Sequence, residues 1–288
     1  ARHKHLSPII FDRYMAYTTI HNSLSLVNNN RRHGINIFEG HLHLIRKVIL
    51  FSLFTFHFSL FTFSQSDLRI GQWSEHLPYN IGSTVTQSPT RVYYGTEFAL
   101  IAISKEDSSE VEFFSKVDGL SDVAPSWIKY NDTFKTLIIG YANGNIDLMD
   151  TDGVTNVNDI LRNTSIQGDK RITNIYVDGS SLVYFSTPFG LVIMDLVTRQ
   201  FKSTVFTNSP VQGFTVFEGR YYLAVENGLY SYDPLSGNII EDFSSWTKIV
   251  VPSLPGQYSC QAVDVYQGTL YAGLDGDLYK LDQGEFLL

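Results

Sequence analysis

The sequence predicts an all-β chain folded as a β-propeller of four-stranded blades. Short, aromatic-rich apolar runs recur five times between residue 92 and the C-terminus, and the turn glycines Gly144, Gly190, Gly228 and Gly276 lie 38 to 48 residues apart. That period, built from short strands, is typical of propeller blades. The five copies are VYYGTEFAL (Val92–Leu100), LIIGYANGNI (Leu137–Ile146), VYFSTPFGL (Val183–Leu191), YYLAVENGL (Tyr221–Leu229) and LYAGLDGDL (Leu270–Leu278).

The third copy shows the four strands expected of one blade. Apolar alternation predicts strands at 172–177, 182–186, 191–195 and 201–206. Asp178–Gly179 is the first hairpin turn, because Asp and Gly tolerate positive φ. Small residues recur where we expect crowded central strands, at Gly95, Gly140, Ser186, Ala224 and Gly273.

The blade count points to an incomplete ring. Residues 66–288 hold five repeats, within the four to eight blades of propellers, but the fifth ends at Glu285–Leu288, inside its expected outer strand. Gly71–Tyr79 (GQWSEHLPY) is interpreted as a leading strand without a hairpin of its own. Such a strand either closes on the fifth repeat or belongs with a missing partner blade. We expect a fragment of a seven-bladed propeller, with 66–288 as its incomplete domain.

The N-terminal region predicts export. Arg46–Lys47 precede the apolar run Val48–Phe63, which is shorter than the roughly 20 residues of a spanning helix. Residues 44–65 therefore resemble a signal peptide cleaved near Ser64, with a signal anchor or a buried strand as the alternatives. Residues 1–43 have no sustained period and are left unassigned, as translated upstream sequence.

Charge disfavours two classes of partner. Residues 1–65 carry seven Lys/Arg and two Asp/Glu, whereas 66–288 carry fourteen Lys/Arg and twenty-seven Asp/Glu. Nucleic-acid binding and electrostatic attachment to an anionic bilayer both draw on an excess of cations. We expect no nucleic-acid partner.

The reactive residues are too few to predict an enzyme. Beyond the signal segment the chain has one histidine, His76, and one cysteine, Cys260, which we expect to be buried. One histidine and one cysteine do not provide the usual machinery of acyl transfer or of a zinc site, and we interpret His76 as a solvated or packed side chain rather than a base. The sequence therefore predicts no catalytic residue, no metal and no cofactor. A hydrolase using two carboxylates stays open as a third hypothesis, since no acidic pair stands out.

One segment resembles a calcium loop. Asp150–Asp159 matches several positions of an EF-hand, but Leu148 occupies the first ligand position. The repeat accounts for the same residues as the turn between the third and outer strands of the second blade, and we adopt that interpretation.

Tryptophans are candidates for a sugar platform, because an exposed indole can stack on a saccharide. Three fall in or near predicted loops and outer strands: Trp73, Trp127 and Trp246. The alternative is that they pack between blades.

Several phrases of the repeat are similar to known propellers. GLSDV (119–123), ITNIYVDG (172–179) and NGLYSYD (227–233) resemble the two-component-regulator propeller repeat. More narrowly, GQWSEHLPY (71–79), FSKVDGLSDV (114–123) and GNIDL (144–148) resemble the N-terminal propeller of PorZ-type surface proteins of the type IX secretion system.

The resemblance implies a non-catalytic scaffold at the cell surface, outer membrane or periplasm. It would serve a secretion-attachment complex, with other secretion proteins and a lipopolysaccharide or oligosaccharide as its partners. The alternative is an oligosaccharide-binding sensor propeller of a hybrid two-component regulator.

Overall fold

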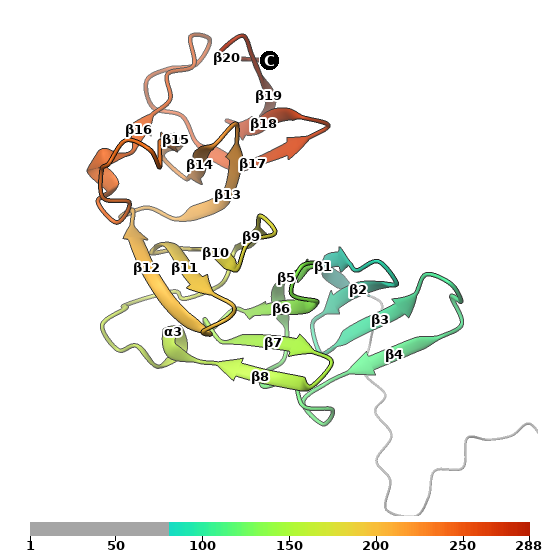
Figure 1. Ribbon diagram of the computed structural model, residues 1–288. Helices are drawn as coiled ribbons and strands as arrows, with labels where there is room; N and C mark the ends of the chain where they lie inside the picture. The colour runs from blue at the N-terminus through green and yellow to red at the C-terminus, as the bar shows by residue number, and fades with distance from the viewer. Residues whose placement is uncertain (1–80) are drawn as a thin grey trace, which may run out of the picture. The chain divides into compact units, whose positions relative to one another are not determined.

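The computed structural model describes residues 81–288, which form five antiparallel sheets of four strands each. Within each sheet the strands lie side by side in chain order, as Figure 1 shows. The first three sheets consist of β1 (Gly82–Gln87), β2 (Arg91–Thr96), β3 (Leu100–Ser104) and β4 (Val111–Phe114); β5 (Pro125–Asn131), β6 (Thr136–Tyr141), β7 (Ile146–Asp150) and β8 (Gly153–Val157); and β9 (Asn174–Val177), β10 (Leu182–Thr187), β11 (Gly190–Asp195) and β12 (Gln200–Phe206).

The remaining two sheets follow the same plan. They consist of β13 (Val211–Phe217), β14 (Arg220–Val225), β15 (Gly228–Tyr232) and β16 (Thr247–Lys248); and β17 (Cys260–Tyr266), β18 (Thr269–Leu274), β19 (Asp277–Asp282) and β20 (Glu285–Leu287). In the described part, helix is confined to the single turns α3 (Asp159–Arg162) and η1 (Phe243–Ser245). The predicted fold class, an all-β propeller of four-stranded blades, is confirmed.

The hairpin turns form where the sequence places them. In the third sheet the Asp178 carboxylate accepts the N–H of Ser180 at 2.9 Å, which closes the β9–β10 turn. The calcium-like segment is a turn as well. β7 ends at Asp150, β8 begins at Gly153, and the Asp150 carboxylate accepts the Asp152 N–H at 2.9 Å.

The hydrophobic core lies between consecutive sheets. Four clusters of buried side chains fill the four interfaces between neighbouring sheets. The central strand β6 has all six residues buried, because it is covered on both faces. Alternate residues of a strand point to opposite faces, so one strand contributes to two clusters: Leu137 packs toward the first sheet and Ile138 toward the third.

In each of the first three sheets, a hydroxyl residue at or just before the start of the inner strand links that sheet to the next. The Ser83 hydroxyl donates to the carbonyl of Pro125 (3.1 Å), Ser126 to that of Ile172 (2.8 Å), and Thr173 to that of Val211 (2.7 Å). Strand register shifts at Ser83 and Ser126, and at the equivalent Gln212 and Gln261 of the last two sheets. A β-bulge turns its extra residue out of the ladder, which directs Ser83 and Ser126 toward the neighbouring sheet.

Candidate functional site

A polar hollow of about 320 Å³ lies where the inner strands of the first three sheets end. Its walls come from the end of β1, the end of β5 with the following turn, and the turn between β9 and β10. The lining of this strand-end hollow consists of Thr86, Gln87, Lys129, Tyr130, Asn131, Asp132, Thr133, Val177 and Gly179.

Asn131 gives the hollow its rigid wall. Its side-chain oxygen accepts the N–H groups of Thr133 (3.0 Å) and Phe134 (3.1 Å), so the β5–β6 turn is fixed by a residue that is 1% exposed. Its amide nitrogen donates to the Ser180 carbonyl at 3.4 Å, which ties this turn to the β9–β10 turn. The walls from the second and third sheets therefore hold each other in place.

Tyr130 supplies a half-buried aromatic surface. Its ring is stacked on Tyr93, with centroids 5.9 Å apart and planes 14° apart, and its N–H donates to the Thr86 hydroxyl at 3.2 Å. Burial is the main cause that raises the pKa of Tyr130, with smaller contributions from Tyr93 and Asp132. The phenol therefore stays protonated and can donate a hydrogen bond.

The polar groups around Tyr130 suit binding rather than bond cleavage. Lys129 is half-buried and has no ion-pair partner among residues 81–288, while Gln87, Asp132 and Thr133 add an amide, a carboxylate and a hydroxyl. Asp132 is the only carboxylate in the lining, so the hollow does not assemble the paired acids of a glycoside hydrolase. Sequence reasoning missed this site, since its residues are ordinary strand-end and turn residues in three separate repeats.

A second hollow of about 210 Å³ lies under the loop that joins β16 to β17. Its lining is mainly apolar, from Ile249 to Pro255. The Lys248 ammonium lies 5.1 Å from the centre of the Tyr258 ring and donates to the Gly256 carbonyl at 3.1 Å. Because its cation is already engaged, this hollow serves loop packing.

A buried carboxylate joins the first sheet to the second. Asp147 is 0% exposed and accepts hydrogen bonds from the Tyr141 hydroxyl (2.8 Å), the Ser121 N–H (2.8 Å) and the Asn156 amide (2.9 Å). Burial raises the pKa of Tyr141, and the neighbouring Asp147 raises it further. This cluster is closed to solvent and fixes the β4–β5 connection, so its role is structural.

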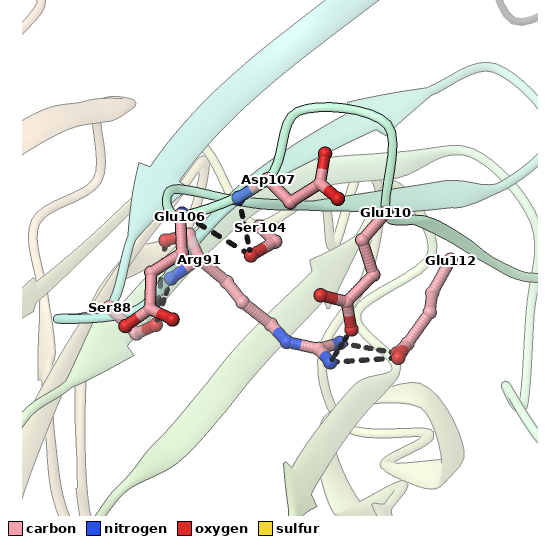
Figure 2. A network of polar contacts seen from close by, with 7 residues as sticks. All are labelled: Ser88, Arg91, Ser104, Glu106, Asp107, Glu110 and Glu112. Carbon is pink, nitrogen blue, oxygen red and sulfur yellow. Dashed lines mark hydrogen bonds and ion pairs between the residues drawn. The ribbon is translucent and has the colours of Figure 1, made fainter.

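Figure 2 shows a polar network at one end of the first sheet. The Arg91 guanidinium makes a two-point ion pair with Glu112 and lies 3.5 Å from Glu110. The hydrogen bond from Arg91 is the largest cause that holds the pKa of Glu112 below its usual value. These groups are largely in water, where such pairs contribute ~0–1 kcal/mol, and we assign them to the turn rather than to a site.

The four turn glycines have backbone conformations that favour glycine. Their φ angles are +84° at Gly144, +154° at Gly190, +144° at Gly228 and +93° at Gly276. Gly190 is the most constrained, because a Cβ there would lie 2.0 Å from the Val205 carbonyl oxygen.

Two of the three candidate tryptophans lie in the described part. Trp246 is 5% exposed, stacks on Tyr232 at 5.1 Å and donates its indole N–H to the Ile240 carbonyl at 3.0 Å. Trp127 is half-buried and packs against the core between the second and third sheets. Neither lines the strand-end hollow, so a sugar-platform role for them stays a prediction.

Cys260 is buried at the start of β17, with 1% exposure. Burial raises the pKa of its thiol to about 12. Several predictions fall outside the described residues: those for residues 1–43, the predicted signal peptide at 44–65, the predicted leading strand Gly71–Tyr79, Trp73 and His76.

Comparison with known proteins identifies the family. The model of the PorZ N-terminal β-propeller domain of the type IX secretion system matches residues 92–247, more than half of the chain. No curated protein matches. No helix within residues 81–288 is long and apolar enough to cross a membrane.

Solved structures agree with that match. PorZ of Porphyromonas gingivalis, an essential bacterial surface component of the type IX secretion system, is 26% identical with a TM-score of 0.65. The alignment covers 74% of this chain and 28% of PorZ. The extracellular domain of a hybrid two-component system from B. thetaiotaomicron is 18% identical with a TM-score of 0.56, over 68% of this chain and 26% of that one, and shows the fold alone. The chain belongs to the family of PorZ N-terminal β-propeller domains.

Proposed function

We propose that this chain is a non-catalytic propeller scaffold of a type IX secretion attachment complex, acting at the cell surface, outer membrane or periplasm. The family match over residues 92–247 carries the proposal. The chemistry of the described residues supports it, because the open hollow presents hydrogen-bond donors and acceptors without a nucleophile–base pair. Its partners are other proteins of the complex.

Disruption of the gene tests this function. The expected result is retention of secreted cargo inside the cell, restored by the full chain supplied in trans. Normal secretion in the disrupted strain would refute the proposal.

The strand-end hollow is the proposed site for a lipopolysaccharide or another oligosaccharide. Tyr130 offers a half-buried aromatic surface, and Gln87, Lys129, Asp132 and Thr133 offer polar groups at its rim. Saccharides are bound by this combination of an aromatic face with several hydrogen-bonding groups.

Two lysine variants, one in the hollow and one outside it, test the saccharide site. Lys129→Met keeps the length of the side chain but removes its charge, and Lys280→Met makes the same change on an exposed strand of the fifth sheet. With purified lipopolysaccharide of the producing bacterium we expect about a tenfold weaker Kd for the first variant, roughly 1.4 kcal/mol, and no change for the second. Equal binding by both variants would exclude the hollow.

The alternative is an oligosaccharide-binding sensor propeller of a hybrid two-component regulator, since the extracellular domain from B. thetaiotaomicron has the same fold. A sensor would change the transcription of saccharide-utilisation genes when an oligosaccharide is added. If disruption of the gene blocks secretion but leaves this transcriptional response intact, the result supports the scaffold over the sensor.

Export through a signal peptide at residues 44–65 is part of the proposal. We expect the mature protein to begin near Gln65, and N-terminal sequencing of the native protein checks this. A mature protein that retains residues 1–43 would contradict the assignment of that segment as translated upstream sequence.

We also propose that these five sheets belong to a larger propeller. Leu229 of the fourth sheet is 0% exposed because the fifth sheet covers it, whereas its register equivalent Leu278 is 65% exposed. Tyr266, the equivalent of the packed Phe217, is 66% exposed. A native protein no larger than residues 65–288 on an immunoblot would contradict this proposal.

A further inference from the structure

The connection between β15 and β16 differs from its counterparts in the other sheets. The third and fourth strands are joined by residues 105–110, 151–152, 196–199 and 283–284 in those sheets, but by residues 233–246 in the fourth. Figure 1 draws this segment, the β15–β16 loop, in orange between the two strands. It ends at a fourth strand of only two residues.

Aromatic residues of β15 and of the loop itself hold the β15–β16 loop in place. The Tyr232 hydroxyl donates to the Asn238 carbonyl at 2.5 Å, and the Trp246 indole donates to the Ile240 carbonyl at 3.0 Å. The rings of Tyr230 and Phe243 lie 4.8 Å apart, and those of Tyr232 and Trp246 lie 5.1 Å apart. These contacts fix the loop at both ends and in the middle.

Hydrogen bonds within the loop complete its framework. The Ser245 hydroxyl donates to the Ile239 carbonyl at 3.1 Å, and the Asp242 carboxylate caps η1 by accepting the Ser244 N–H at 2.9 Å. An ordered loop loses little conformational entropy when it binds a partner.

This framework displays two aliphatic side chains in water. Leu235 is 92% exposed and Ile239 is 68% exposed, while the adjacent Ile240 packs against the core between the third and fourth sheets. Single exposed apolar residues are common on protein surfaces. Two on one ordered loop form an apolar contact surface that is already fixed before a partner binds, so burying it costs little ordering entropy.

The charge around the two side chains selects the kind of partner. Residues 233–246 contain Asp233, Glu241 and Asp242 and no Lys, Arg or His. Asp233 lies 3.6 Å from Arg220 of β14, whereas Glu241 and Asp242 have no ion-pair partner among residues 81–288. Acids beside apolar residues repel an anionic membrane surface and complement a protein with basic residues around an apolar socket.

We propose that the β15–β16 loop is a protein-docking surface, with Leu235 and Ile239 inserted into an apolar socket that has a basic rim on a partner protein. This inference rests on the proposed scaffold function and names the surface that performs it.

Site-specific photo-crosslinking tests the proposal in the full chain within the producing bacterium. A photoreactive phenylalanine analogue replaces Leu235 in one variant and Val197 in another. Val197 lies in the corresponding connection of the third sheet and, at 68%, is as exposed as Ile239. We expect one protein to be captured from position 235 and not from position 197, and mass spectrometry identifies it.

Binding of that purified protein then measures the contribution of the two side chains. We expect its Kd to be at least about tenfold weaker for the double variant Leu235→Ser, Ile239→Ser and unchanged for Val197→Ser. The substituted residues are exposed, so both variants should keep the wild-type melting temperature. Unchanged Kd for the double variant overturns the docking surface.

Two further outcomes separate this inference from the function on which it rests. If a partner protein is crosslinked from position 197 and not from position 235, the chain is still a scaffold but binds its partner at another surface. That result overturns only the assignment of the β15–β16 loop. If the chain binds phosphatidylglycerol vesicles and the double variant does not, the loop is a membrane contact. That result would overturn the proposal of a protein partner.

Discussion

Asp147 shows how much one residue contributes to the join between two sheets. Its carboxylate accepts three hydrogen bonds, from a backbone N–H, a tyrosine hydroxyl and an asparagine side-chain amide. Since one of these donors is the Ser121 N–H in the β4–β5 connection, the side chain holds that connection against β7.

We therefore expect Asp147→Asn to be strongly destabilising. The new amide group would direct its own N–H groups at existing donors, leaving buried groups unpaired at a cost of about 2–4 kcal/mol. Denaturant unfolding measures the loss. Asp152→Asn, at an exposed turn position, is the matched control and should change the free energy of unfolding by less than about 0.5 kcal/mol.

Cys260 gives a prediction about pH. Burial raises the pKa of its thiol to about 12 from an ordinary value near 9, so the folded chain holds the proton more tightly than the unfolded chain. Below about pH 8 both states keep the proton and stability does not depend on it. Between these two pKa values the unfolded chain loses its proton first, so this residue lowers stability as the pH rises.

A thiol reagent checks the same property directly. We expect Ellman's reagent at pH 8 to react with Cys260 only after denaturant unfolds the chain, because the thiolate is the reactive form. Rapid labelling of the native protein would contradict the buried environment.

At the level of single elements, Gly190 opens β11 at a point of close approach. Its φ of +154° is costly for any other residue, and a Cβ would lie 2.0 Å from the backbone of β12. We expect Gly190→Ala to cost about 2–4 kcal/mol, since two strands must separate to admit the methyl group. Gly219→Ala has open space and a φ of +74°, so about 1 kcal/mol is expected there. Thermal unfolding of the two variants compares them, and equal losses would contradict the steric argument.

The sequence predicts the elements better than the contacts between them. Strands such as β10 and β11 follow from apolar alternation bounded by turn residues, which are local signals. β1 was missed, because its small and polar residues in GSTVTQ carry no such alternation. The repeat also does not indicate the length of the β15–β16 loop, whose following strand begins only at Thr247.

The candidate site was less accessible to sequence reasoning. Lys129, Asp132 and Gly179 come together only because three inner strands end at the same place, and no spacing within one repeat encodes this. Asp147 was equally hidden, although a lone acid within the apolar run Ile146–Met149 is a usable sign of a buried polar contact.

Across residues 81–288 as a whole, stability should differ between sheets. The second and third sheets are covered on both faces, with β6 wholly buried, whereas the fifth exposes Tyr266 and Leu278. Amide exchange is slowest where opening a strand uncovers the most apolar contacts. We expect hydrogen-exchange mass spectrometry to find the strongest protection in β6 and β10 and the weakest in β17–β20. Uniform protection would show that the five sheets open as one unit.

The hydroxyl groups that link the first four sheets have a consequence for folding after export. In each observed pair the donor precedes its acceptor along the chain: Ser83 before Pro125, Ser126 before Ile172, Thr173 before Val211. A chain exported N-terminus first would therefore carry a free hydroxyl on the last blade to have folded, and the next blade could dock on it as soon as it had crossed the membrane. Assembly in this order would limit the exposed apolar chain to about one repeat at any moment, which protects a slow-folding β protein from aggregation.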